Sequence, residues 1–305
     1  EVIDIPEIER YERPDVAQSL DVVTEGFLPG FTVTIPEVLE LRRKYDLLEL
    51  LLLDGEEKTL LWECTGDDLD ELVKEKVLTK AECKAADCTH HPNYVEYGEL
   101  YEKRFDLLKK AYKRSHISED PDFQKFVEAN REWIKDYALF MTVKKCFHGA
   151  SWLEWADDIR LRWDYSVDYY YSQYPEEIEF YEYLQSKFSQ QWKKLKTYAN
   201  EKGIQIIGDI PIYVAMDSAD AWAHPDLFQM DEDRKPKGVA GCPPDAFSDD
   251  GQLWGNPLYR WDYHRHQNYD WWVSRMKHCY ELYDVVRIDH FRGFDEYYSI
   301  PYGDE

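Results

Sequence analysis

The sequence has no long hydrophobic run and few basic residues, and each of these absences excludes a class of protein. The longest leucine-rich stretch, residues 47–53, is interrupted by Glu49, whereas a membrane-spanning helix needs about 20 predominantly apolar residues. Lysine and arginine number 37 against 62 aspartates and glutamates, which gives a formal charge of −25. Because nucleic acids and anionic membrane surfaces both attract basic proteins, we expect a soluble protein that binds neither.

Cysteine is also scarce and has no regular spacing. The 6 cysteines are spread thinly, no pair has C-x-x-C spacing, and the chain contains no N-x-[ST] glycosylation site. These features favour a reducing, cytoplasmic location. Cys83, Cys88, His90 and His91 offer thiol and imidazole ligands, but their spacing matches no standard zinc pattern, so we expect no metal there.

Aromatic residues are abundant. The chain has 11 tryptophans, 24 tyrosines and 13 phenylalanines, enough bulky apolar surface to form a large core, which excludes an acidic disordered protein. A chain of 305 residues is ordinarily two domains or one large α/β barrel with insertions.

We divide the chain into three parts by composition and periodicity. Residues 1–67 hold 17 acidic and 6 basic side chains and are predicted to form a short strand at 31–35, a helix at 36–53 and acidic flanks. Residues 68–202 have the spacing of four amphipathic helices, a helical subdomain. We expect Ser118 to cap the third helix and the fourth to span residues 175–202, ending at Gly203.

Residues 203–305 have the pattern of an α/β fold. Two β-branched runs, 204–214 and 283–291, are typical of parallel strands covered on both faces, and a helical stretch over 269–282 precedes the second. The intervening segment, 215–268, is too long for an ordinary loop of a few residues, and such long loops are usually functional.

Charged residues stand at the carboxyl ends of both predicted strands. Arg287 and Asp289 have the same strand parity, so both side chains point to one face. A guanidinium beside the carboxylate favours its ionised form, as a nucleophile requires, although a structural ion pair remains the alternative. Asp209 is either an acceptor for a substrate hydroxyl or a turn aspartate that caps the next segment, and spacing alone favours the turn.

The long intervening segment carries large aromatic residues among glycine, proline and asparagine. Phe247, Trp254 and Tyr259 suit a sugar, whose ring has an apolar face and a hydroxyl edge, but packing on a barrel is the alternative. His264 and His266 could share one face of a strand, and we expect a surface role for them because their neighbours are charged.

Three long motifs together resemble one known family. They are IGDIPIYVAMDSADAWAHPDLF (207–228), VAGCPPDAFSDDGQLWGNPLY (239–259) and VVRIDHFRGFDEYYSIP (285–301). They resemble the 4-α-glucanotransferases, also called amylomaltases or disproportionating enzymes, of glycoside hydrolase family 77. The helical part, beginning with DLDELVKEKVLTKAEC (68–83), extends the resemblance to about residues 68–305.

The resemblance implies a portion of a (β/α)8 TIM barrel with mostly helical inserted subdomains, with barrel strands three and four and a glucan-covering loop (239–259) in residues 203–305. It implies no cofactor and cytoplasmic metabolism of α-1,4-glucans and maltooligosaccharides, which act as donor and acceptor. Asp289 matches the catalytic nucleophile, and Arg287 matches the arginine that holds it ionised. The substrate-binding set that the motifs supply is Asp209, Phe247, Gln252, Trp254, Asn256 and His290.

The implied reaction is a retaining double displacement. Asp289 attacks the anomeric carbon while a general acid protonates the departing oxygen, and the 4-hydroxyl of a second glucan then displaces the enzyme. The acid/base glutamate and a third carboxylate come from later strands in the family, so we expect an incomplete chain with negligible turnover alone. An α-glucan hydrolase and a non-catalytic glucan-binding protein are the alternatives.

Overall fold

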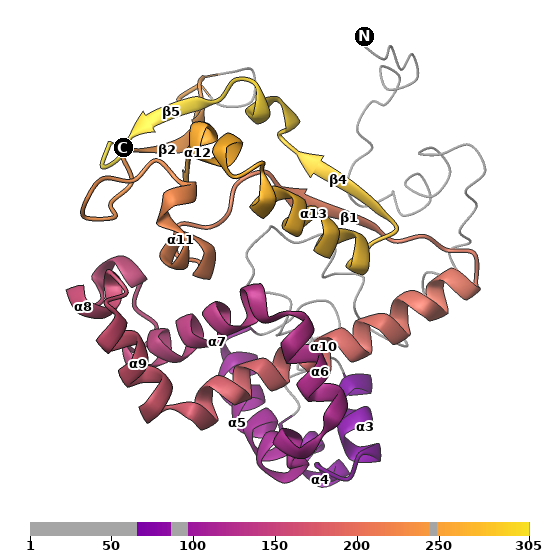
Figure 1. Cartoon of the computed structure of the whole chain (residues 1–305). Helices are drawn as coiled ribbons and strands as arrows, with labels where there is room; N and C mark the ends of the chain where they lie inside the picture. Colours follow the sequence, from indigo (N-terminus) through magenta and orange to yellow (C-terminus); the bar gives the residue numbers. More distant parts are fainter. Residues whose placement is uncertain (1–65, 87–96, 245–248, 305) are drawn as a thin grey trace.

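The computed structural model describes residues 66–86, 97–244 and 249–304, which form a helical part and a part that contains the strands (Figure 1). The strand and helix expected at 31–35 and 36–53 lie outside the described residues, as does Phe247. None of the helices in the described ranges combines the length and apolarity needed to cross a membrane.

The helical part precedes the first strand. Its helices are α3 (Gly66–Lys74), α4 (Lys80–Ala85), α5 (Tyr97–Ser115), α6 (Pro121–Ala129), α7 (Arg131–Cys146), α8 (Asp157–Arg160), α9 (Asp164–Gln173) and α10 (Pro175–Glu201). The long helix expected at 175–202 is confirmed as α10. α10 begins with Pro175. Proline suits this position because a first-turn N–H has no acceptor within the helix, so its absence costs nothing. Gly203, at φ +77°, follows the end of the helix.

The third expected helix is in fact two helices, α6 and α7, and the prediction that Ser118 caps it was wrong. Asp120, not Ser118, caps α6: its carboxylate accepts the backbone N–H of Asp122 at 2.8 Å. The Ser118 hydroxyl donates instead to Glu179 of α10, at 2.8 Å. Asn130 ends α6 and begins α7, so the apolar periodicity continues across a break that it does not reveal.

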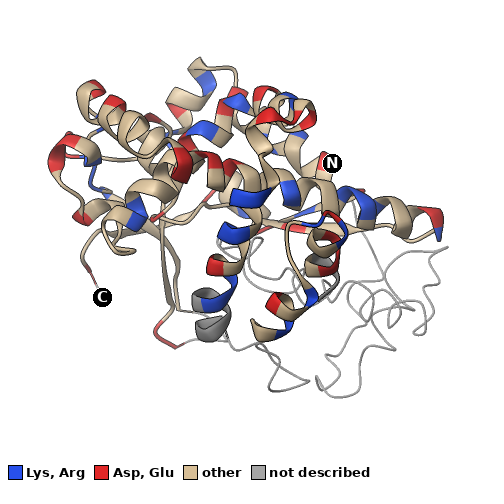
Figure 2. Ribbon diagram, turned by 90° about the horizontal axis from the view of Figure 1, so that it is seen from below, with Lys and Arg blue, Asp and Glu red and all other residues tan. Residues whose placement is uncertain are grey.

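The core of the helical part lies between α7 and α10. Ile134, Leu139 and Val143 of α7 are fully buried, and Tyr183 of α10 is equally inaccessible. Burial of each large apolar side chain contributes roughly 1.5–3 kcal/mol, so this contact is the main support of the helical part. Acidic and basic positions are interspersed along the helices (Figure 2).

The strands form two small sheets. β1 (Ile207–Pro211) and β4 (Val285–Asp289) pair in parallel, whereas β2 (Gly238–Cys242), β3 (Gln252–Pro257) and β5 (Tyr298–Pro301) form an antiparallel sheet in the order β3-β2-β5. The remaining α-helices are α11 (Ala219–Ala223), α12 (Trp261–His266) and α13 (Asp270–Leu282). Because α10 leads into β1 and α13 into β4, the expected α/β alternation is confirmed.

The parallel sheet has one covered face and one open face among the described residues. Ile210 is 6% exposed on the covered face, but Ile207 and Val285 on the other face are 47% and 37% exposed. Parallel strands normally have both faces covered. An open apolar face on two parallel strands agrees with a portion of a larger α/β barrel, which the resemblance implies.

The segment between the parallel strands is folded. It contains α11, β2, β3 and α12, so the predicted excursion is a small structured insertion. His264 lies in α12, is 1% exposed, and its Nε2 lies 3.1 Å from the Leu227 carbonyl oxygen. Both histidines lie on a helix and not on a strand. The surface position predicted for His266 is confirmed, whereas that for His264 was wrong, because charge at neighbouring positions does not reveal which side of a short helix is packed.

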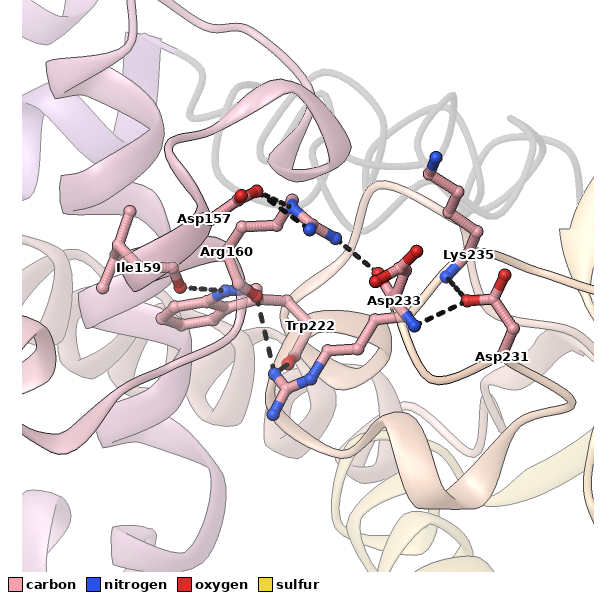
Figure 3. Close-up of polar contacts among 8 residues, drawn as sticks. Asp157, Ile159, Arg160, Trp222, Asp231, Asp233 and Lys235 are labelled. Carbon is pink, nitrogen blue, oxygen red and sulfur yellow. Dashed lines mark hydrogen bonds and ion pairs between the residues drawn. The ribbon is translucent and has the colours of Figure 1, made fainter.

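Side chains of α8 and α11 connect the helical part to the insertion. Figure 3 shows the Trp222 indole donating to the Ile159 carbonyl oxygen, at 3.1 Å. The Arg160 guanidinium donates to the Asp157 carboxylate and to the Asp233 carbonyl oxygen in the turn before β2. Trp222 also packs 5.8 Å from the ring of Phe140 on α7, so one core passes from the helices into the strand-containing part.

Candidate functional site

The candidate site is built on neighbouring strand ends. Asp209 of β1 stands beside Arg287 of β4, and Pro211 stands beside Asp289. The Arg287 guanidinium donates to Asp209 Oδ2 and, through its other nitrogen, to Asp289 Oδ1 at 2.8 Å. The predicted juxtaposition of Arg287 and Asp289 is thus present, and Asp209 joins them.

This carboxylate–arginine group is open to solvent. The side chains of Asp209, Arg287 and Asp289 are 42%, 59% and 61% exposed. What burial there is raises the pKa of Asp209 above its ordinary value of 3.8, and the Arg287 charge opposes that effect. Because exposed ion pairs contribute little to stability, a purely structural role explains this arrangement poorly.

His290 follows Asp289 and turns the chain sharply. Its backbone is left-handed, at φ 52°, and its ring lies edge-on to Trp254 with centroids 5.0 Å apart. Its Nε2 is buried and has no hydrogen-bond partner among the described residues. A Cβ on Gly293 would lie 2.8 Å from the His290 ring, so glycine permits this close approach.

β3 brings the aromatic insertion to the same place. The Trp254 indole donates to Gln252 Oε1 at 2.8 Å, and Trp254 remains 37% exposed. Asn256 donates its side-chain N–H to the Val214 carbonyl oxygen at 2.8 Å, which attaches β3 to the segment that follows β1. An indole with a fixed ring plane beside polar groups is a surface on which a sugar ring can stack.

Two residues that support this site were not predicted. Tyr213 lies between the two groups, with ring centroids 6.4 Å from Trp254 and 6.2 Å from His290. Arg275 of α13 donates to the carbonyl oxygens of Pro211, the last residue of β1, and of Ile212, at 2.8 and 3.1 Å. Tyr213 stands two residues after the end of β1, the end at which the other predicted site residues gather, so its position was a usable signal. The sequence gives no such signal for Arg275.

Seven of the eight predicted site residues lie in the described ranges, and the eighth, Phe247, lies outside them. A cavity of about 1080 Å³ adjoins this site on the helical side, between α7, α10 and α13 and next to Asp209 and Tyr213. Within the described ranges no group of three histidine, cysteine or acidic side chains is placed to hold a metal ion. Cys88, His90 and His91 lie outside those ranges.

Comparison with curated proteins identifies one family. The 4-alpha-glucanotransferase of Clostridium butyricum is 44% identical over 239 residues, which is 78% of this chain and 49% of the relative. The enzyme of the same name from Streptococcus pneumoniae is 42% identical over 240 residues, 78% of this chain and 48% of the relative. The chain thus spans about half the length of the curated relatives it matches.

Solved structures and a family model agree with these relatives. The amylomaltase from Streptococcus agalactiae in complex with acarbose superposes with a TM-score of 0.74 and 40% sequence identity, covering 77% of this chain and 48% of that chain. A family model described as 4-alpha-glucanotransferase matches residues 48–305. The motifs on β1, β3 and β4, the partial barrel and these matches agree, and the chain belongs to the 4-alpha-glucanotransferase family.

Proposed function

We propose that this chain supplies the nucleophile side of a 4-α-glucanotransferase site, which transfers α-1,4-glucan segments between maltodextrins. The observation that carries the proposal is the Arg287 guanidinium, which bridges Asp209 and Asp289 at the ends of two parallel strands beside Trp254 and His290. Enzymes on barrels place their reacting groups at this end of the strands.

In this proposal Asp289 is the nucleophile. Arg287 holds Oδ1, which leaves Oδ2 to attack the anomeric carbon as the glycosidic C–O bond breaks. The departing 4-oxygen takes a proton from a general acid, which the family resemblance assigns to a later barrel strand and not to these residues. The 4-hydroxyl of an acceptor glucan then reverses the step, with loss of its proton to the same group.

The remaining site residues bind the donor sugar. Trp254 stacks on a ring, and Gln252 fixes the plane of its indole. Asp209 accepts a hydroxyl hydrogen. His290, whose ring lies edge-on to Trp254, borders the same sugar. Asn256 attaches β3 to the Val214 carbonyl oxygen, which keeps Gln252 and Trp254 in position for the sugar. The family resemblance assigns Phe247 to the loop that covers the glucan.

α-1,4-Glucans and maltooligosaccharides are the proposed donor and acceptor, with no cofactor, no nucleic acid and no membrane. The S. agalactiae amylomaltase is named as a complex with acarbose, which supports a sugar-like ligand for this chain. A cytoplasmic location is part of the same proposal, and it agrees with Cys83, Cys146 and Cys279, which are thiols.

The test uses a donor whose leaving group needs no acid. Fluoride departs unprotonated, so incubation with a ring-fluorinated α-glucosyl fluoride should add one sugar to Asp289, seen by mass spectrometry of the Asp289 peptide. Asp289→Asn is the control and should take up no label. Absence of an adduct, or an adduct on another residue, contradicts the proposal and favours a non-catalytic glucan-binding protein.

Natural glucans distinguish transfer from hydrolysis. With maltotriose alone we expect negligible turnover, because the departing sugar must be protonated. Should the chain act on maltotriose, glucose together with longer oligomers indicates transfer, whereas glucose and maltose without longer products indicate the hydrolase alternative.

A further inference from the structure

One face of α9 presents aromatic rings to solvent. Tyr165, Asp168, Tyr169 and Ser172 have the spacing i, i+3, i+4, i+7, which places them on one side of a helix. All four are exposed, and the two tyrosines are 62% and 53% exposed. This outward face alternates a ring, a carboxylate, a ring and a hydroxyl.

The opposite side of α9 holds the helix to the core. Val167, Tyr170 and Tyr171 pack against the main hydrophobic cluster, and the Tyr171 hydroxyl donates to the Lys135 carbonyl oxygen at 3.3 Å. Ser166 is buried and donates to Asp158 at 2.9 Å. Packing therefore accounts for the inner face of α9 but not for the rings on its outer face.

A third ring extends this outward face at its N-terminal end. Trp163, just before α9, is 47% exposed and lies 5.8 Å from the Tyr165 ring. Tyr174, just after α9, instead stacks on Tyr170 of the inner side, with centroids 5.7 Å apart. Large apolar side chains are usually exposed singly, so a row of this length indicates a binding surface.

The charges beside these rings select the ligand. α9 carries Asp164 and Asp168 and has neither lysine nor arginine, so its ionised side chains only accept hydrogen bonds. Anionic ligands are repelled there, and a second copy docked by the same face would bring its own carboxylates against them. A neutral sugar chain instead offers hydroxyl donors to the carboxylates and apolar ring faces to the aromatic side chains.

We propose that the outward face of α9, with Trp163, is a second binding site for α-1,4-glucan chains. In Figure 1, α9 lies at the far side of the helical part from β4, so this site is separate from the one that holds Asp289. The choice of glucan rests on the function proposed for the β4 site, whereas the existence of a sugar-binding face rests on the α9 side chains alone.

Affinity electrophoresis of the 305-residue chain through native gels that contain amylose tests the site. Both rings are exposed, so Tyr165→Ala/Tyr169→Ala should fold, and we expect its affinity for amylose to fall about tenfold. Tyr280→Ala removes a ring of α13 that is 56% exposed and is the matched control, with unchanged retardation. The single variants Tyr165→Ala and Tyr169→Ala should each lose roughly threefold and serve if the double variant unfolds.

Trp254→Ala separates this proposal from the one for β4. If the Trp254→Ala variant is still retarded by amylose and the α9 variants are not, the second site is supported, even where the function proposed for the β4 site is contradicted. Equal retardation of the α9 variants and Tyr280→Ala, or no retardation of the unchanged chain, overturns it. A change from dimer to monomer on Tyr165→Ala/Tyr169→Ala in sedimentation, without a change in amylose affinity, also overturns it and assigns the face to self-association.

Discussion

The Arg287 guanidinium on β4 donates a hydrogen bond to the Asp209 carboxylate on β1, so one side chain joins the two parallel strands. A second nitrogen of the same group binds Asp289. Lysine carries one compact ammonium and cannot reach both carboxylates with fixed geometry. We therefore expect Arg287→Lys to slow labelling of Asp289 by the activated glycosyl fluoride at least about tenfold.

The same substitution should barely change stability, because the pairs are exposed and such pairs contribute at most about 1 kcal/mol. Arg292→Lys is the control: its side chain is 77% exposed and pairs with Glu296 in the turn after β4. Labelling of Arg287→Lys at the rate of Arg292→Lys would show that Arg287 does not orient the nucleophile.

Gly208 on β1 lies against the Tyr283 ring. A Cβ at Gly208 would approach that ring within 2.0 Å, so the ring or the strand must move. We expect Gly208→Ala to lower the free energy of unfolding by about 1–3 kcal/mol, measured by urea denaturation. In a Tyr283→Ala background the same change should have less than half that effect, and simple additivity of the two substitutions would refute the steric explanation.

The sequence predicted the features that depend on local pattern. The residues of α10, α13 and both parallel strands carry periodicity, a starting proline or a β-branched run, and strand parity alone placed Arg287 and Asp289 on one face. Local pattern failed where tertiary contacts decide. Ser118 has a good capping side chain, but it lies inside a 3-10 turn, Ile117–Glu119, and donates to Glu179 of another helix. Asp120 stands directly before Pro121, the first residue of α6, and caps the helix.

Other parts of the site have no local signature. Arg275 binds carbonyl oxygens more than 60 residues earlier in the chain, and its neighbours Trp271 and Trp272 indicate only a packed helix. Motif resemblance, not spacing, indicated His290 and Gln252 as site residues. The open face of the parallel sheet agrees with a portion of a barrel, which the resemblance of the three motifs predicted.

Glu182 on α10 gives a pH-dependent prediction. Burial, with a smaller contribution from Glu179, raises its pKa from 4.5 to about 7. The folded state therefore holds the proton more tightly than the unfolded state. The stability that this provides is complete below pH 4.5 and is lost as the pH rises through about 7.

Glutamine has no proton to lose. At pH 8, Glu182→Gln should therefore have a free energy of unfolding roughly 1–3 kcal/mol higher than the unchanged chain, measured by urea denaturation. At pH 4 this advantage should disappear. Glu201→Gln, exposed at the last position of the same helix, is the control. An advantage of Glu182→Gln that is equal at both pH values would show that the ionisation of Glu182 is not its cause.

Lys144 of α7 forms an ion pair with Asp217 that links the helices to the segment after β1. Their side chains are only 10% and 26% exposed, and Asp217 also accepts the backbone N–H of Trp152 at 3.3 Å. Removal of the ammonium leaves a poorly solvated carboxylate. We expect Lys144→Met to lower the free energy of unfolding by about 2–4 kcal/mol in urea denaturation.

The contrast with an exposed pair identifies the cause. Lys125 and Asp122 are 76% and 77% exposed, so Lys125→Met removes a similar contact in water and should change stability by less than about 0.5 kcal/mol. Adding Asp217→Asn to Lys144→Met removes the carboxylate charge that faced the ammonium but keeps an oxygen acceptor for Trp152, so it should recover part of the loss. If Asp217→Asn instead adds its own full loss to that of Lys144→Met, the lysine stabilises by its packing in α7 rather than by pairing with the carboxylate.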